Sequence, residues 1–393
     1  MSNSQTNQTR LLDITNRISP IFLLLIFSLF VTPLSLKAEK LDSEFQSMED
    51  FSTVYHLIKS RYIKENRSKD LIFSAMKGML RDLDPYSDIL TREDLEKLEL
   101  HSVGKYVGIG LMVQINKEQF VVTQIFEGSP AEKAGIVVGD VIVSVDGVFL
   151  KGKSEEDIGR LLIGSKGTEV NLELKKEDQE KGIRKATLVR EEVKANSVTC
   201  FNYDNQIKVI TVYQFLKHTA KEISQCMKEE STPNLVLDLR NNPGGLLIGA
   251  VEAAELFLGI GEVVMVRNRA NEILEKYVSR KSLPENAPRL VVLINRYSAS
   301  AAEILSGAIK DRKAGYLIGE TSFGKGVVQS VFKVNSDLFV KMTTAHYFTP
   351  SNKSFDGVGV KPDLEVPQEG KLARYESTDL AYHKALDYFS SKQ

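Results

Sequence analysis

Residues 290–305 read LVVLINRYSASAAEIL, and this stretch decides the fold. Its first five residues form a continuous apolar run, which is typical of a buried strand. A helix is predicted from about residue 299 to 309, after a short link rich in small residues. A buried strand that leads directly into a helix is the repeating unit of a layered α/β domain.

The same alternation continues on both sides of this unit. Strands are predicted at residues 207–212, 235–239 and 316–320, and helices at residues 220–228 and 246–258. No internal repeat of fixed period accompanies them. The second half of the chain is therefore expected to form one α/β domain.

Two regions with different sequence patterns precede this domain. Between residues 41 and 98, apolar side chains recur at three- and four-residue steps, which predicts helices. Pro85 is expected to end the first helical run, and a capping box that begins at Thr91 is expected to start another short helix. Between residues 106 and 193, short β-forming runs alternate with Gly-rich turns, around one helix at 154–162. This second region is expected to be a compact β-domain with a charged hairpin tip.

The N-terminus is expected to carry either an export signal or a membrane anchor. Residues 21–31 are apolar except for Ser28, and Arg10 and Arg17 precede them, as in a secretory signal. The uncharged stretch 18–36 is also close to the ~20 residues that cross a bilayer. Both alternatives place the rest of the chain outside the cytoplasm.

Composition limits the partners and cofactors. Lys plus Arg total 51 and Asp plus Glu total 52, so no basic footprint for nucleic acid is present. The two cysteines, Cys200 and Cys226, exclude a disulfide framework; they are able to pair in an oxidising compartment, but two separate thiols are the favoured interpretation. Five scattered histidines show no metal-ligand spacing, so neither a metal nor a cofactor is expected.

Ser300 is the first candidate for chemistry. It lies where the link enters the predicted helix, so that unpaired N–H groups and the positive end of the helix dipole surround it. Such N–H groups can stabilise a developing oxyanion. The structural alternative is a helix-capping serine among closely packed alanines.

Lys325 is the second candidate, in the segment FGKGVVQ at residues 323–329. Burial lowers the pKa of a lysine and yields a neutral amine that can accept a serine proton. Gln329, four residues later, is expected to hydrogen-bond Lys325 and orient the amine if the segment adopts a turn-like conformation. The alternative is a surface lysine beside a glycine turn. Neither His218 nor His346 has the acidic support of a Ser–His–Asp triad.

The segment LDLRNNPGG at residues 237–245 is the third candidate. A strand ends there in a polar turn, and its glycine pair offers backbone N–H groups to an oxyanion. Asp238 and Arg240 are expected to form a structural ion pair or turn hydrogen bonds rather than to act as catalysts.

Five ordered motifs resemble the C-terminal processing (tail-specific) serine peptidases of the Ser–Lys type. The motifs are LDPYS (83–87), LDLRNNPGG (237–245), SASAAE (298–303), FGKGVVQ (323–329) and the closing segment 349–363. The loop GIGL (108–111), followed by GSPAEKAGI (128–136), resembles a PDZ domain. The departures, Ala302 and Asn352, touch no expected catalytic role.

The resemblance implies a crotonase-like α/β protease core with an inserted β-rich PDZ domain and an N-terminal helical segment. The implied divisions are a signal peptide or anchor (1–38), the helical segment (39–102), the PDZ domain (103–193), the peptidase core (194–370) and a C-terminal tail (371–393).

The resemblance also implies catalytic roles by position. Ser300 matches the nucleophile, Lys325 the general base, and Gln329 the residue that orients the lysine. The N–H groups of Gly245 and Ala301 match the oxyanion hole.

Ser298 matches a neighbouring serine rather than the nucleophile. In the PDZ domain, four residues match the loop that captures the carboxylate of a substrate tail: Gly108, Ile109, Gly110 and Leu111.

The function implied is therefore an exported endopeptidase that cleaves proteins near their C-termini. Its expected partners are protein tails, together with an adaptor or a second copy of the chain, and no nucleic acid. Its expected location is the periplasm or cell envelope, with residues 18–36 as an inner-membrane anchor if they are retained. The alternatives are a non-catalytic PDZ tail-binding protein of the envelope and a crotonase-type lyase acting on acyl thioesters.

Overall fold

The structure is a computed structural model that describes residues 32–393, except positions 103, 117–118, 127, 154, 177–181, 195–196, 369–371, 373 and 392–393. The chain divides into two compact units after Met79. Most of the signal or anchor expected at residues 1–38 lies outside the described residues. Within residues 32–393 as described, no helix combines the length and apolarity that crossing a membrane requires.

The N-terminal unit is helical, as the three- and four-residue periodicity predicts. It contains α2 (Thr32–Arg61) and most of α3 (Ser68–Arg81). Asp70 lies in the first turn of α3 and Arg81 in its last turn, so both charges complement the helix dipole. The second unit begins at Leu80. Its first elements are β1 (Asp88–Thr91) and α4 (Arg92–Ser102), where Thr91 and Asp94 form the predicted capping box.

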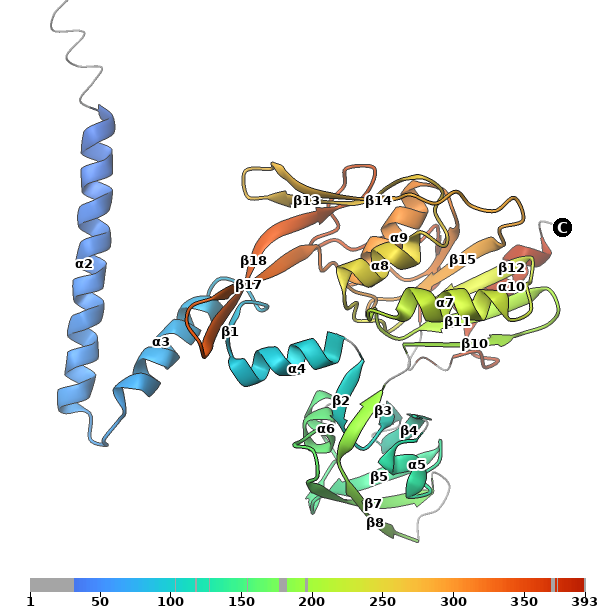
Figure 1. The fold of residues 1–393 in the computed structure, drawn as a ribbon, viewed down its shortest axis with the longest axis horizontal. Coiled ribbons are helices and arrows are strands. Elements are labelled where there is room, and N and C mark those ends of the chain that lie inside the picture. Colours follow the sequence, from blue (N-terminus) through green and yellow to red (C-terminus); the bar gives the residue numbers. More distant parts are fainter. Residues whose placement is uncertain are drawn as a thin grey trace, which may run out of the picture. The chain divides into compact units, whose positions relative to one another are not determined.

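The β-domain has its own apolar core and an antiparallel sheet (Figure 1). Strand β7 shows why the sheet forms there, because Val170, Leu172 and Leu174 are buried and alternate with more exposed side chains. The sheet order is β3-β4-β5-β7-β8, with β6 paired to β5, while β2 and β9 form a separate ribbon.

The elements of the β-domain are β2 (Lys105–Gly108), β3 (Leu111–Asn116), β4 (Gln119–Ile125), α5 (Pro130–Lys133), β5 (Asp140–Val145), β6 (Val148–Phe149), α6 (Glu155–Leu162), β7 (Glu169–Lys176), β8 (Arg184–Val189) and β9 (Glu191–Lys194).

The α/β domain is built on a six-stranded sheet in the order β10-β11-β12-β15-β16-β19. Strands β11 to β19 of this sheet pair in parallel, and only β10 is antiparallel. Helices α7, α8 and α9 pack on one face through a large apolar core (Figure 1). The predicted strand–helix alternation from residue 207 onward is confirmed.

The elements of this layer are β10 (Val198–Asn202), β11 (Ile207–Val212), α7 (Thr219–Lys228), β12 (Asn234–Asp238), α8 (Leu247–Ala254), β15 (Arg289–Ile294), α9 (Ala301–Asp311), β16 (Tyr316–Gly319), β19 (Leu364–Glu365) and α10 (Leu380–Ser390).

A second sheet of the α/β domain is antiparallel. Its order is β1-β18-β13-β14, with β17 also paired to β18. The strands not yet given are β13 (Gly261–Asn268), β14 (Ile273–Ser279), β17 (Val327–Lys333) and β18 (Leu338–Phe348). Strand β1 joins this sheet in the register Asp88↔Lys341. The sheet therefore brings the LDPYS segment, immediately before β1, to the strands that follow Lys325.

The described residues near the C-terminus belong to the core. Helix α10 covers the face of the six-stranded sheet that α7–α9 leave open, through Tyr382, Ala385 and Phe389. These side chains pack against alternate residues of the central strands, such as Val236 and Val291. The segment expected to be a simple tail thus supplies one layer of the domain.

The prediction of two separate thiols is wrong. Cys200 in β10 and Cys226 in α7 form a disulfide, with their Cα atoms 6.1 Å apart. The two residues are separated by 26 positions in the sequence, and their spacing carried no signal of pairing. The bond fastens α7 to the antiparallel edge of the main sheet.

Candidate active site

Ser300 lies at the N-terminus of α9, where β15 ends and the chain turns back. It is the helix N-cap, with φ 53°, a left-handed conformation that is strained for a residue with a side chain. The side chain is half-buried. The first turn of α9 therefore directs unpaired N–H groups toward the space around a partly accessible hydroxyl.

Glu303 holds this turn in place and also binds the segment of Lys325. Its carboxylate is fully buried, and Oε2 accepts hydrogen bonds from the N–H groups of Ser300 and Lys325, both at 2.8 Å. Oε1 accepts from Ser322 Oγ and from the Gly324 N–H, both at 2.6 Å. One buried carboxylate thus fixes the two segments that carry the candidate nucleophile and base. Burial raises the pKa of Glu303, and the four donors oppose that rise.

The closing segment 349–363 supports the loop of Lys325 from the other side. Asp356 Oδ1 accepts a hydrogen bond from the Gly326 N–H at 3.0 Å, and the N–H of Gly357 donates to the Gly324 carbonyl. Gly324 has φ +91°, and a Cβ there would lie 3.0 Å from two backbone nitrogens. The glycines that flank Lys325 therefore allow the close contact between these two loops.

Lys325 is half-buried beside the start of β17. Burial lowers its pKa, the positive charge of Lys341 lowers it further, and Glu303 opposes both effects. The Nζ atom lies 4.4 Å from the centre of the Tyr86 ring. Within the described residues, no hydrogen bond joins Nζ to Ser300 or to Gln329.

Gln329 lies in β17 opposite Thr343 in β18. Its Nε2 donates to Thr343 Oγ1 at 3.4 Å, so its side-chain amide is held at the junction of these strands. Strand β17 begins two residues after Lys325 and pairs there with the end of β18. Gln329 and Lys325 therefore lie in the same β17–β18 region.

Ser298 is engaged in a structural role. It is fully buried, and its hydroxyl donates to the carbonyl of Leu239 at 2.8 Å while accepting from the Asn295 N–H at 2.9 Å. The Ser298 hydroxyl therefore acts as both donor and acceptor, and it joins the turn after β12 to the turn after β15. Of the two neighbouring serines, Ser300 is the accessible one.

The glycine turn after β12 lies directly against Ser300. A Cβ on Gly244 would lie 2.8 Å from the Ser300 Cβ and 2.9 Å from the Ala301 nitrogen, so only glycine fits there. The next residue, Gly245, forms an isolated parallel bridge with Phe215. In such a bridge the N–H of Gly245 points away from its partner.

The glycine turn after β12 and the start of α9 each present a backbone N–H group. Within the part of the chain that the structure describes, the N–H groups of Gly245 and Ala301 make no hydrogen bond. Asn242 fixes their surroundings, because its side chain accepts from the Gly244 N–H and its carbonyl accepts from the Ala299 N–H. The two segments named for the oxyanion hole are thus brought together.

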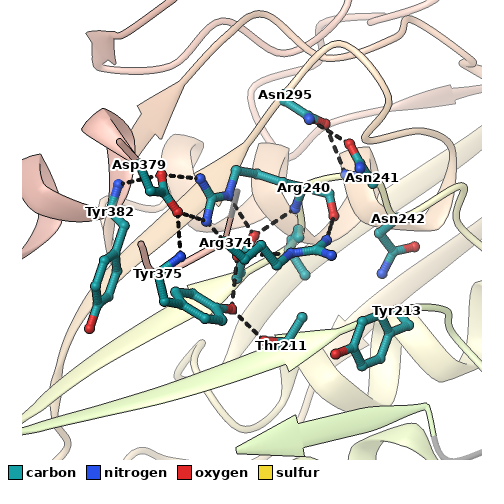
Figure 2. Close-up of polar contacts among 12 residues, drawn as sticks. Thr211, Tyr213, Arg240, Asn241, Asn242, Asn295, Arg374, Tyr375, Asp379 and Tyr382 are labelled. Carbon is teal, nitrogen blue, oxygen red and sulfur yellow. Dashed lines mark hydrogen bonds and ion pairs between the residues drawn. The ribbon is translucent and has the colours of Figure 1, made fainter. Parts of the chain in front are cut away.

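A buried ion cluster lies behind the same turn (Figure 2). Arg240 donates to Asp238 and to Asp379, and all three side chains are almost completely buried. Burial raises the pKa of Asp238, but Arg240 and Arg374 lower it to about 2. The Tyr375 hydroxyl also donates to Asp238. The predicted Asp238–Arg240 ion pair is confirmed, and the C-terminal segment completes it.

The GIGL loop of the β-domain lies beside an apolar groove of about 300 Å³, lined in part by Ile109, Gly110, Leu111 and Leu162. Gly110 has φ +80°, and a Cβ there would lie 2.1 Å from the Ser129 Cβ. In the described part of the chain, the N–H groups of Ile109 and Gly110 have no acceptor. Strand β3, which follows the loop, is an edge strand of its sheet. An extended peptide can pair with such an edge while the loop binds its carboxylate.

Sequence reasoning missed three residues of this region. Glu303 appeared only as the end of the SASAAE motif, Asn242 as part of a polar turn, and Tyr86 as a letter in LDPYS. Their presence inside the quoted motifs was the available signal, but their roles depend on contacts between segments far apart in the sequence.

Comparison with known proteins matches three regions of the chain. Residues 206–366 match the family model described as Peptidase family S41, and residues 121–176 match a PDZ domain. Residues 31–94 match the model described as Activating protease CtpB N-terminal domain.

Whole-chain relatives agree with these matches. The chain is 34% identical over 325 residues to a protein of Staphylococcus aureus (strain N315) named as a CtpA-like serine protease, covering 81% of this chain and 65% of that one. It is 30% identical over 349 residues to a carboxy-terminal-processing protease of Bartonella bacilliformis, covering 87% of this chain and 80% of that one. The chain thus spans about two thirds of the Staphylococcus relatives and most of the Bartonella relative.

A solved structure has the same fold. The photosystem II D1 C-terminal processing protease is 31% identical and superposes with a TM-score of 0.53, over 79% of this chain and 85% of that chain.

Proposed function

Because the chain belongs to peptidase family S41 together with the carboxy-terminal-processing proteases, we propose that it is a serine endopeptidase that cleaves proteins near their C-termini with Ser300 and Lys325. The observation that carries the proposal is the carboxylate of Glu303, which binds the N–H groups of both residues. The segments of Ser300 and Lys325, 25 positions apart in the sequence, are thereby held at the N-terminus of one helix. The core that carries them is proposed to be of the crotonase type.

The first step is acylation. The neutral amine of Lys325 accepts the proton of the Ser300 hydroxyl as Oγ bonds to the carbonyl carbon of the scissile peptide. The carbonyl electrons move to oxygen, and the N–H groups of Gly245 and Ala301 donate to the resulting oxyanion. As the oxyanion collapses, the C–N bond breaks, and Lys325 gives its proton to the leaving amine.

The second step is hydrolysis of the acyl-enzyme. Water attacks the ester carbon while Lys325 takes a water proton, and the same proton then returns to Ser300 as its Oγ leaves. Gln329 is proposed to orient the amine during these transfers, from its place at the junction of β17 and β18. Partial burial of Lys325 lowers its pKa and so favours the neutral amine, which supports its proposed role as the general base.

The β-domain is proposed to select the substrate. The GIGL loop binds the terminal carboxylate, and the free edge of β3 pairs with the last residues of the tail. The groove beside them is apolar, so an unstructured tail that ends in apolar residues fits it. The partners are therefore protein tails, with an adaptor or a second copy of the chain as further candidates.

The chain is also proposed to be exported, to the periplasm or the cell envelope. The Cys200–Cys226 disulfide supports this proposal, because such bonds form and persist in oxidising compartments. Residues 18–36 would be cleaved as part of the signal or retained as an inner-membrane anchor.

Cleavage of a protein with an apolar, unstructured C-terminal tail tests the catalytic proposal. Ser300→Ala and Lys325→Ala are each expected to abolish cleavage, whereas Ser351→Ala and Lys353→Ala, at exposed positions, retain it. Mapping of the products by mass spectrometry is expected to place the cut near the C-terminus. Full activity of Lys325→Ala would contradict the dyad, and tail binding without cleavage by the unmodified protein would favour the non-catalytic alternative.

A further inference from the structure

The turn that precedes β1 has no role in the proposed mechanism, yet several side-chain hydrogen bonds hold it in place. Asp84 Oδ1 accepts hydrogen bonds from the N–H groups of Tyr86 and Ser87 at 2.8 Å, and Oδ2 accepts from Ser87 Oγ at 2.8 Å. Ser87 is buried, and its hydroxyl accepts from the Thr343 N–H of β18 at 3.2 Å. The turn is therefore fixed both internally and against the sheet that contains Gln329.

The result of this construction is the position of the Tyr86 ring. Lys325 Nζ lies 4.4 Å from the ring centre, well inside the ~6 Å range of a cation–π contact. Among the described residues, no hydrogen bond or ion pair to the Lys325 ammonium exists. The face of Tyr86 is thus its specific partner in this structure.

We propose that Tyr86 is a positioning residue that holds the charged form of Lys325 in a resting place away from Ser300. The inference rests on the proposed role of Lys325 as the general base. An aromatic face attracts an ammonium through its quadrupole and has no comparable attraction for a neutral amine. Loss of the proton therefore releases Nζ from the ring and frees it to reach Ser300.

Other charges around this pair are fixed by the same fold. Lys341, on β18, repels the Lys325 ammonium, and Glu303, on α9, attracts it. Burial raises the pKa of the Tyr86 phenol, and the negative charges of Asp356, Asp84 and Glu303 raise it further, so the ring stays neutral.

His346, also on β18, has its Nδ1 atom 3.6 Å from Asp356 Oδ2. None of these groups replaces the ring as a direct contact of Nζ.

The test compares the pH dependence of kcat/KM in Tyr86→Leu, which removes the aromatic face, and Tyr86→Phe, which keeps it. Since the face stabilises the ammonium, its loss favours the neutral base at lower pH. Tyr86→Leu is expected to move the acid limb downward, so that kcat/KM at a fixed pH on that limb rises roughly threefold relative to the plateau. Tyr86→Phe is expected to keep the limb of the unmodified protein.

The control is Phe348→Leu, which removes a different cation–π contact, with Arg267 at 4.9 Å. It is expected to leave the acid limb in place. An unchanged limb in Tyr86→Leu, or an equal shift in Tyr86→Phe, would overturn the proposal. A purely structural role of Tyr86 would lower kcat without moving the limb.

A second measurement does not depend on activity. Competitive labelling of lysines with acetic anhydride across pH, followed by peptide mapping, reports the titration of Lys325 directly in a Ser300→Ala background. Labelling at lower pH in Tyr86→Leu supports the contact, and unchanged labelling contradicts it, even if the dyad assignment fails. If Tyr86→Leu does not fold, fluorinated phenylalanines at position 86 keep the ring shape and weaken its face in steps. The labelling midpoint is then expected to fall with each added fluorine, and a constant midpoint contradicts the proposal.

Discussion

At the scale of single residues, the account depends on a lysine that loses its proton more readily than usual. Burial and the charge of Lys341 both lower the pKa of Lys325. The base is active only when neutral, so kcat/KM is expected to rise with pH through the pKa of Lys325 and to level off below the range of an ordinary lysine.

Replacing Lys341 with methionine tests the sign of this electrostatic effect. Removal of the like charge favours the Lys325 ammonium, so the pKa of Lys325 rises and the acid limb moves upward. At a fixed pH on that limb, kcat/KM is expected to fall roughly twofold, and less at high salt. The measurement is the pH profile at two salt concentrations, with Lys353→Met as the exposed control. A downward movement of the limb would refute the electrostatic argument.

Glu303 is the residue that best separates positioning from chemistry. Its carboxylate accepts four hydrogen bonds, whereas a glutamine amide would place N–H groups against two of the four donors. Glu303→Gln is expected to cost about 1–3 kcal/mol of stability for each donor left unpaired. Displacement of Ser300 and Lys325 is expected to lower kcat/KM by roughly 100-fold.

Urea unfolding and kcat/KM measure these two effects separately. Glu320→Gln is the control, since Glu320 forms a more exposed pair with Arg296 at the end of β16. Near-normal kcat/KM in Glu303→Gln would show that the carboxylate does not set the spacing of the two catalytic segments.

At the scale of elements, the C-terminal helix is the most consequential packing feature. Asp379 is the N-cap of α10 and binds Arg240, which lies 139 residues earlier in the sequence. Asp379→Ala leaves the Arg240 guanidinium partly unpaired in a buried site and removes the cap. The free energy of unfolding is expected to fall by about 3–5 kcal/mol.

Urea unfolding checks this value. Asp387→Ala on the same helix removes only an exposed ion pair with Lys384, and is expected to cost about 0.5 kcal/mol or less. Equal effects of the two substitutions would mean that the buried cluster does not anchor α10.

The sequence predicted elements well where their signal is local. The buried strands and helices from residue 207 onward follow from apolar runs and from the turn residues between them, because these signals lie within short stretches of sequence. Strands β14 and β17 were not predicted, since most of their side chains are exposed or only partly buried and form no apolar run. Strand β13 was also not predicted, although its central residues Val263–Val266 are buried. Strand β1 pairs with β18 some 250 residues later, which no periodicity reveals.

The candidate site shows the same division. The elements that carry Ser300, Lys325 and the glycine turn follow from strand ends and motif positions. The Glu303 carboxylate, the Tyr86 ring and the Asp379 partner of Arg240 come from contacts between distant segments. Motif spacing in the sequence indicates which residue types form such a site, but it does not predict which side chains hydrogen-bond to one another.

At the scale of the whole molecule, the disulfide is a test of both stability and compartment. Cys200 and Cys226 close a loop of 26 residues, and a bond of this kind is expected to contribute about 3 kcal/mol. The double substitution to serine is expected to lower the midpoint of urea unfolding without changing kcat/KM per folded molecule, since neither cysteine touches the site. A reducing agent is expected to reproduce the loss in the unmodified protein and to have no effect on the double variant. No change in either case would mean that the bond does not form.

Trapping of the acyl-enzyme tests the central claim most directly. The protein is mixed with an activated ester of a peptide, quenched in acid, and mapped by mass spectrometry. The account predicts one acyl group on the peptide that contains Ser300, located at Ser300 rather than Ser298, and no acyl group in Ser300→Ala or Lys325→Ala. An acyl group at another residue, or unchanged acylation in Lys325→Ala, would contradict it.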